Sequence, residues 1–333
     1  MSDLWLDTWW EHLGHPGRRF ALQVPPWGVP LPLLRERRRG LRCLRAAGGS
    51  SLRCGLRCAA DELVQVGPAF VSALARRRDW DWLELDRLLL PQAHALAQAL
   101  RGAGLSAECA APVRQRYLPL QGPGARVAAA ANPALIAELT RKERALRRRG
   151  CLEFELVTAP EPAAVHFEAC LRLEAAGWKG RAGTAMLSLP AKAAMYRALV
   201  PRLAAAGTLR LALLRLDRRL LAFGLNTVYA GAMAGIKVGY DEAPGSRQFS
   251  PGQLLQWLTL RWAHAQGLRE FDFLGADDAA KADWTPHFRE LARLRALNRT
   301  WRGRAAAFAL RRRRRSRHHG ACAPAELSAP SSS

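Results

Sequence analysis

Three strand-like segments follow one another in the C-terminal half of the chain, and they constrain the fold more than any other feature. Residues 208–217, 220–230 and 232–241 read TLRLALLRLD, LLAFGLNTVYA and AMAGIKVGYD. Only short turns near Asp217 and at Gly231 separate them, so neighbouring segments are expected to pair antiparallel. A helical segment (SPGQLLQWLTLRWAHAQG) and another strand (REFDFLG) come next. This order predicts an α/β fold with one mixed sheet flanked by helices.

The rest of the chain also alternates helical and strand-like segments, with a domain junction expected between Tyr117 and Gly150. Apolar spacing, prolines and glycines set the limits of each segment. Helices are expected over about 3–13, 62–76, 92–100, 162–176 and 190–206, and strands over about 20–24, 29–34, 41–45, 80–88 and 152–157.

The formal charge of +23 comes mostly from arginine, since only five of the 51 basic residues are lysines. Such a charge attracts nucleic acids and anionic surfaces. The arginines are scattered through alanine-rich segments, however, which favours a compositional bias over a dedicated nucleic-acid site.

The seven cysteines indicate a reducing compartment, because they are odd in number and follow no secretory leader. Cys43, Cys54 and Cys58 lack the second ligand pair of a zinc site, so no metal is expected. No apolar run reaches the thickness of a bilayer. We therefore expect a cytoplasmic protein.

Ser250, Pro251, Gly252 and Gln253 open the helical segment that follows the three strands. They predict an N-cap, a first-turn proline and the partner of a capping box. The free N–H groups and dipole of such a helix start attract phosphate, and a glycine lets a pyrophosphate approach the backbone. An ordinary helix start has the same pattern, so both interpretations stay open.

The order and spacing of several segments resemble the GNAT superfamily, and within it the BioF2-like or CelD/BcsL-type acetyltransferases, which are relatives of the FemAB transferases. The similarity runs from about Glu168 to Arg299, through LEAAGWKGRAGTA, LRLALLRLDRRLLAFGL, KVGYDEA, FSPGQLL and GLREFDFLGADDAAKADWTP. A fainter similarity in LDTWWEHLG, RLLLPQAHALAQAL and TRKERALRRRG looks like the first lobe of the family.

The resemblance implies tandem GNAT-like lobes, each with a mixed, mainly antiparallel sheet flanked by helices. Residues 1–140 would form a degenerate N-terminal lobe and residues 141–301 the acyltransferase lobe. Residues 302–333 are basic and rich in Pro, Ala and Ser, and are expected to be a disordered tail.

The resemblance also implies a site for acetyl-CoA. In it, Val238 and Gly239 would lie along the pantetheine, while the pyrophosphate would be held by Ser250, Gly252, Gln253 and Leu254. The acceptor would lie near Trp178, Lys179, Arg181, Asp277 and Asp278.

Acyl transfer needs a base, a group that stabilises negative charge and a proton donor for the thiolate. Asp272 or Glu174 is the candidate base, Tyr240 the candidate acid, and Lys281 or Lys179 the candidate cation. Each has a structural alternative: a hydrogen bond for a buried Asp272, a surface pair for Glu174 and Lys179, and packing at a strand end for Tyr240.

The predicted reaction moves an acyl group to an amine or hydroxyl of a small molecule or saccharide, such as a cell-envelope or exopolysaccharide precursor. One alternative is a FemAB-like transferase that uses aminoacyl-tRNA, which the basic segment Arg141–Arg149 would suit. Nucleic acid is expected only in that case. The other alternative is a degenerate, non-catalytic protein that binds a polyanion or a membrane surface through its arginines and tail.

Overall fold

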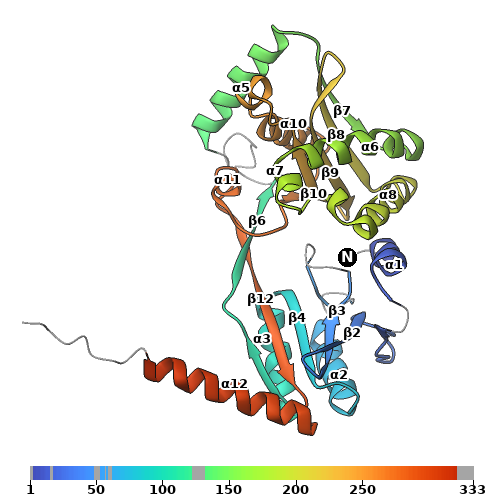
Figure 1. The fold of residues 1–333 in the computed structure, drawn as a ribbon, viewed down its shortest axis with the longest axis vertical. Coiled ribbons are helices and arrows are strands. Elements are labelled where there is room, and N and C mark those ends of the chain that lie inside the picture. The colour runs from blue at the N-terminus through green and yellow to red at the C-terminus, as the bar shows by residue number, and fades with distance from the viewer. Residues whose placement is uncertain are drawn as a thin grey trace, which may run out of the picture.

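The protein has two lobes joined by long strands, as Figure 1 shows for the computed structural model. The structure describes residues 3–15, 18–48, 53–56, 58, 62–121 and 132–320. Strands and helices alternate in both lobes, and helices flank the sheet. The mixed α/β class predicted from the sequence is confirmed.

The first lobe surrounds a single apolar core that includes Phe70, Trp80 and Leu83. Its helices are α2 (Leu63–Ala75) and α3 (Leu90–Gly102). Its strands are β1 (Arg19–Phe20), β2 (Leu33–Arg38), β3 (Leu41–Ala46), β4 (Trp82–Leu89) and β5 (Ser106–Cys109).

The second lobe contains the meander predicted from the sequence. Its strands are β7 (Leu152–Val157), β8 (Leu209–Leu216), β9 (Arg219–Tyr229), β10 (Ala232–Tyr240) and β11 (Glu270–Asp272). β8, β9 and β10 pair antiparallel in sequence order.

Helices cover both faces of the second lobe's sheet, and an apolar core lies on each side. Because both faces are covered, β8 and β9 are nearly continuous apolar runs. One face carries α6 (Pro160–Ala176), the short α7 (Trp178–Arg181) and η2 (Met186–Ser188), and α8 (Pro190–Ala205). The other carries α5 (Pro133–Arg147) and α10 (Pro251–Ala265), while α9 (Pro244–Arg247) and α11 (Ala279–Ala282) lie in connecting segments.

Three further elements cross between the lobes: α1 (Asp3–His12), β6 (Val113–Pro119) and β12 (Phe288–Leu297). β6 pairs with β12 through its first half and with β11 through its second half. β12 returns from the second lobe to lie between β4 and β5. α1 puts Trp5, Leu6 and Trp9 into the core beneath α8.

These crossings make one continuous sheet from the strands of both lobes. The order is β1-β2-β3-β4-β12-β6-β11-β10-β9-β8-β7, with β5 beside β12. The lobe limits expected from the sequence, residues 1–140 and 141–301, stay a prediction, and the exchanged elements lie across both of them.

Prolines account for two strands that differ from their predicted limits. The strand expected over 20–24 is only the short β1, which ends before Pro25 and Pro26, and the strand expected over 29–34 begins only at Leu33. Pro30 and Pro32 have no N–H to donate, so the ladder starts after them. β5, β6 and β12 were not predicted at all, because charged residues interrupt their apolar pattern.

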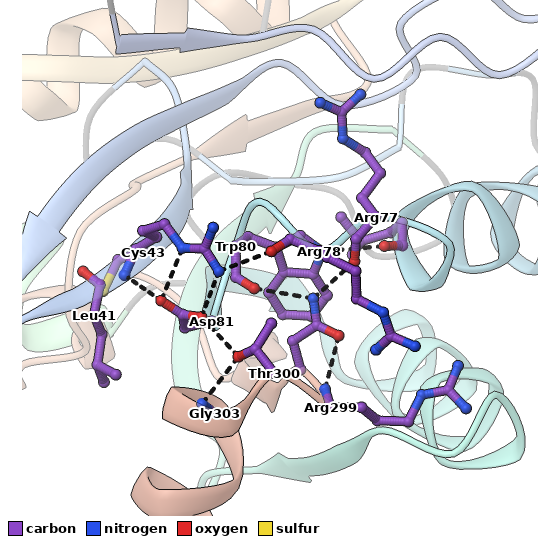
Figure 2. Close-up of polar contacts among 12 residues, drawn as sticks. Leu41, Cys43, Arg77, Arg78, Trp80, Asp81, Arg299, Thr300 and Gly303 are labelled. Atoms are coloured by element: carbon purple, nitrogen blue, oxygen red, sulfur yellow. Dashed lines mark hydrogen bonds and ion pairs between the residues drawn. The ribbon is translucent and has the colours of Figure 1, made fainter.

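The basic tail is helical where the sequence predicted disorder. α12 runs over Trp301–Gly320, and residues 321–333 lie outside the described part. Arginine and alanine both favour a helix, and the Thr300 hydroxyl accepts a hydrogen bond from the N–H of Gly303 at 3.0 Å. Thr300 in turn donates to the buried Asp81, which also accepts from Arg42 (Figure 2). These contacts fix the start of α12 to the first lobe.

Among the described residues, every helix is too short or too polar to cross a bilayer. The same part of the chain brings no three His, Cys, Asp or Glu side chains into a group that could hold a metal ion.

Candidate active site

The site forms where two parallel strands separate. β10 and β11 pair only from Ala232 to Ala234, after which the register of β10 is broken between Gly235 and Lys237. β11 ends at Asp272, and positive φ angles at Leu274 (49°) and Gly275 (66°) turn the chain away. The separation leaves one edge of β10 open. A cavity of about 730 Å³ lies against this edge, bounded also by α6, α7, α11 and the start of α10.

The start of α10 differs from the predicted capping box. Ser250 has a left-handed conformation (φ 49°, ψ 56°), and its hydroxyl accepts a hydrogen bond from Lys142 at 2.7 Å. The side-chain oxygen of Gln253 accepts from the indole N–H of Trp284 at 2.9 Å. Neither side chain therefore caps the helix, so the capping-box prediction is wrong. Among the described residues, the backbone N–H groups of Gly252 and Gln253 have no acceptor.

The structure gives a packing reason for a glycine at position 252 that the sequence did not predict. A Cβ atom there would lie 2.8 Å from Cδ1 of Tyr240. The ring of Tyr240 thus occupies the space beside Gly252 and packs against the first turn of α10. The glycine is required by this packing.

Glu174 and Lys179 form a buried bridge on the opposite wall. Glu174 is 3% exposed and accepts hydrogen bonds from Lys179 at 3.0 Å and from the N–H of Met186 at 2.7 Å. Lys179 also donates to the carbonyl of Val238 at 2.6 Å. Lys179 therefore connects the end of α6 to the open edge of β10. This excludes the surface pair that the sequence left as an alternative.

The third wall is the segment around α11. Asp278 caps this helix by accepting from the N–H of Lys281 at 2.9 Å, and the two side chains form an ion pair at 3.2 Å. The Lys281 ammonium also donates to the carbonyl of Ala276. Both charged groups line the cavity.

Asp272, the first candidate base, is held inside the protein. It is 2% exposed and accepts hydrogen bonds from Gln115 at 2.6 Å and from the N–H of Leu274 at 2.9 Å. It also forms ion pairs with Arg53 at 3.3 Å and Arg289 at 3.8 Å. With these partners, Asp272 connects β11 to the first lobe and does not line the cavity.

Three other predicted residues also lie outside the cavity lining. Asp277 is paired with Arg116 at 2.6 Å, and hydrogen bonding to this guanidinium lowers its pKa. Arg181 is paired with Glu242 at 2.6 Å. Leu254 is fully buried in the core, and its N–H is bonded to the carbonyl of Ser250. The N–H of Leu254 is therefore not free to bind a phosphate.

The other ten site residues predicted from the sequence come together around the cavity. They are Glu174, Trp178, Lys179, Val238, Gly239, Tyr240, Ser250, Gly252, Gln253 and Lys281, and Asp278 joins them.

One cavity residue, Lys237, was missed from the sequence. Its ammonium lies 5.6 Å from the ring centroid of Tyr196 on α8. Burial, together with the positive charges of Lys192 and Lys179 and against the opposing effect of Glu174, lowers the pKa of Lys237 to about 8. Burial also raises the pKa of Tyr196, with a contribution from Glu174. The only signal in the sequence was a lysine inside the apolar segment AMAGIKVGY.

A family model described as acetyltransferase (GNAT) domain matches residues 135–284 of this chain. A search among curated proteins finds no match. The structure of FemX has 12% sequence identity and a TM-score of 0.61, over 87% of this chain and 90% of that one.

Two other solved structures share the fold. L-PGS from Bacillus licheniformis has 14% identity and a TM-score of 0.52, covering 95% of this chain and 97% of that one. The C-terminal domain of a putative lysylphosphatidylglycerol synthetase from Agrobacterium fabrum has 16% identity and a TM-score of 0.51, covering 88% and 87%. At these identities the likeness is one of fold, and it extends across both lobes. The cavity, with its open β10 edge and free α10 amides, lies within residues 135–284, the part of this two-lobed chain that is similar to the acetyltransferase (GNAT) domain model.

Proposed function

We propose that the protein is an acyl-CoA-dependent acyltransferase whose cofactor binds along the open edge of β10. The observation that carries this proposal is the pair of unbonded N–H groups at Gly252 and Gln253, at the mouth of the cavity. Two such donors at the positive end of a helix form a binding site for a pyrophosphate. Arg247, on the preceding turn, also lines the cavity and adds positive charge.

The pantetheine arm would lie extended along the open edge of β10, in the place of a neighbouring strand. On the edge that faces β11, β10 has no strand partner beyond Ala234, although its other edge stays paired with β9. Backbone groups on that open edge near Val238 and Gly239 could therefore bind an extended ligand. In this structure Lys179 donates a hydrogen bond to the carbonyl of Val238, and this bond would have to break before the pantetheine could bind that carbonyl. Tyr240, packed on Gly252, lies within the same cavity and is the candidate proton donor for the departing thiolate.

The acceptor would enter at the wall made by α7. Trp178 is 49% exposed and forms an apolar surface there, with Lys179 beside its ring at 5.9 Å. An exposed aromatic ring next to cations suits a sugar or another polar acceptor with an anionic group. We propose an acetyl donor and a saccharide or envelope-precursor acceptor, as in BioF2-like or CelD/BcsL-type enzymes, acting in the cytoplasm.

Calorimetric titration with CoA tests the proposal. The wild-type protein is expected to bind CoA saturably, and Gly252→Ala to bind at least about tenfold more weakly, a loss of about 1.4 kcal/mol. The new methyl group displaces the Tyr240 ring beside the pyrophosphate site. Gly245→Ala is the matched control, because nothing lies within 4 Å of a Cβ at that position. Absence of saturable binding to the wild type would refute the proposal and favour a degenerate lobe.

A second candidate function is transfer from aminoacyl-tRNA. α5 carries the exposed arginines Arg141, Arg144 and Arg147, and Lys142 on the same helix contacts Ser250 at the start of α10. Positive charge thus adjoins the proposed phosphate site. Two of the structures similar in fold are named for lysylphosphatidylglycerol synthesis.

The two candidates differ in what the purified protein consumes. An acyl-CoA enzyme releases free CoA thiol from acetyl-CoA, whereas the alternative enzyme deacylates charged tRNA and binds it less tightly as salt increases. Arg144→Glu on α5 should weaken only the tRNA interaction. Consumption of charged tRNA without release of CoA thiol would replace the first candidate by the second.

A further inference from the structure

The lysines of this chain gather at one place. Only five of the 51 basic residues are lysines. Lys179, Lys237 and Lys281 line the cavity, and Lys142 donates to Ser250 in its lining. The fifth, Lys192, is close enough for its charge to act on Lys237. Arg247 also lines the cavity, but a lysine amine, unlike a guanidinium, can lose its proton in a protein.

Lys237 has the position expected for an amine that reacts. It lies directly after the break in register of β10 and three residues beyond the last pair with β11. Its ammonium has no hydrogen-bond acceptor and no ion pair among the described residues, and its closest ring is Tyr196. Each of the other four lysines has a partner. Lys142 and Lys179 form ion pairs with glutamates, Lys281 forms an ion pair with Asp278, and Lys192 donates a hydrogen bond to the carbonyl of Thr184.

The charges around Lys237 oppose its protonation. α7 and α8 contribute the cations Lys179 and Lys192, and α8 contributes the neutral Tyr196. α6 contributes the carboxylate Glu174, whose oxygens are already bonded to Lys179 and Met186. Farther along the lining are the charged groups Glu242, Arg247, Asp278 and Lys281. Burial and two positive neighbours thus outweigh one occupied carboxylate.

We propose that Lys237, as a neutral amine, is the catalytic base that takes the proton from the nucleophile of the acceptor. This inference rests on the proposed function. The lone pair of the acceptor nitrogen or oxygen forms the bond to the acyl carbon, and the C–S bond breaks with its electron pair on sulfur. The proton of the nucleophile passes to Nζ of Lys237, and Tyr240 gives its proton to the CoA thiolate. The Lys237 ammonium then releases its proton to solvent, from which Tyr240 is protonated again. No other reactant is consumed.

The other groups in the cavity are less suited to this step. Both oxygens of Glu174 accept hydrogen bonds, and Asp278 caps α11 and pairs with Lys281. Asp272 lies outside the cavity lining. Glu242 accepts hydrogen bonds from the N–H of Trp178 and from Arg181. Lys237 has no hydrogen-bond acceptor or ion pair among the described residues, so its lone pair is free once it has lost its proton.

Pulse labelling with acetic anhydride tests the amine without reference to acyl transfer. Peptide mass spectrometry would follow acetylation of Lys237 from about pH 6 to about pH 11. In the folded protein half-maximal labelling is expected near pH 8. In the protein unfolded in urea the midpoint should move to the ordinary lysine value of about 10.4. Equal midpoints in the two states would overturn the proposal.

The same labelling places Lys237 relative to the cofactor. Saturating CoA should shield Lys237 from the reagent if its amine lies at the thioester. Binding of CoA without shielding would overturn the base role. Failure of CoA to bind at all, seen by calorimetry, would refute the proposed function and the base role together, while a midpoint near pH 8 would still identify a reactive amine.

Kinetics test the proton transfer itself. Lys237→Arg keeps a cation but cannot act as a base, so kcat should fall by at least about 100-fold while CoA affinity stays within about twofold. In the wild type, kcat should decrease as the pH falls below about 8, because Lys237 becomes protonated, and this decrease should be absent from Lys237→Arg. Lys192→Arg on α8 is the matched control and should retain both the activity and this decrease. Activity within about threefold of wild type in Lys237→Arg would reject the assignment.

Discussion

Asp272 and Lys237 are charged side chains on neighbouring strands of the second lobe, and their surroundings act on them in opposite ways. Asp272 is buried but surrounded by donors: Gln115, the N–H of Leu274 and two arginines. These contacts hold the carboxylate in place between β11 and the first lobe. Lys237 is largely enclosed without an acceptor, so its charged form is penalised. The same burial therefore makes one residue structural and leaves the other reactive.

Lys237→Met is expected to stabilise the protein at pH 7. The folded pKa of about 8 lies below the ordinary 10.5, so the unfolded chain binds the proton more tightly. Below about pH 8 the folded wild type carries the full free-energy cost of burying the ammonium. Its free energy of unfolding therefore rises as the pH increases from about 8 to 10.5. Removing the amine should raise the free energy of unfolding by about 1–2 kcal/mol at pH 7 and by nothing near pH 10.5.

Urea unfolding of Lys237→Met at both pH values measures this gain. Val238→Met, one position along β10 and 42% exposed, controls for the methionine itself. A loss of stability at pH 7, or a gain that persists at high pH, would contradict the expected penalty.

At the scale of elements, the segments that the sequence predicted correctly are those encoded locally. The meander β8–β10, the strand β7 and the helices α1, α6, α8 and α10 follow from apolar spacing and from prolines and glycines at their ends. β6 and β12 escaped prediction because arginines alternate with their apolar residues, and only distant partner strands stabilise them.

The candidate site divides in the same way. Of the residues predicted at the end of β10 and the start of α10, Val238, Gly239, Ser250, Gly252 and Gln253 line the cavity and Leu254 does not. Asp272 was misread because Gln115 and Arg53, its partners, come from far away in the sequence. The contact between Gly252 and the Tyr240 ring could not be predicted either, because the two residues belong to different elements.

α12 depends on one buried carboxylate of the first lobe. Burial alone would raise the pKa of Asp81, but hydrogen bonds from Arg42 and Thr300 outweigh it and lower the pKa to about 2 (Figure 2). Because the folded pKa lies below the unfolded value, this stability is present above about pH 4 and is lost as the pH falls towards 2. Asp81 joins the turn before β4 to the start of α12.

Asp81→Asn should therefore lower the free energy of unfolding by about 3 kcal/mol at pH 7, because the Arg42 guanidinium loses its partner. Denaturant unfolding should show the gap to the wild type narrowing below about pH 4. Asp79→Asn is the control: its ion pairs are about a third exposed, so its loss should stay below about 1 kcal/mol. Equal losses in the two variants would argue against the special role of Asp81.

At the scale of the whole molecule, the two lobes exchange elements that neither can supply for itself. The first lobe takes β12 from the end of the chain, and the second takes α1 from the beginning. β6 pairs with β12 and with β11, so the backbone hydrogen bonds of the sheet run continuously from one lobe to the other. The wall of the cavity at β11 is itself paired to β6. The geometry of the site therefore depends on both lobes.

This coupling predicts that damage to one core weakens both lobes. Leu294 of β12 is fully buried in the first lobe and Leu225 of β9 in the second. Leu294→Ala should cost about 3 kcal/mol, and hydrogen exchange should show amides of β9 losing as much protection as those of β4. Leu225→Ala is the reciprocal variant and should expose β4 equally. If each substitution lowered protection only in its own lobe, the shared strands would not couple the lobes, and the cavity would depend on the second lobe alone.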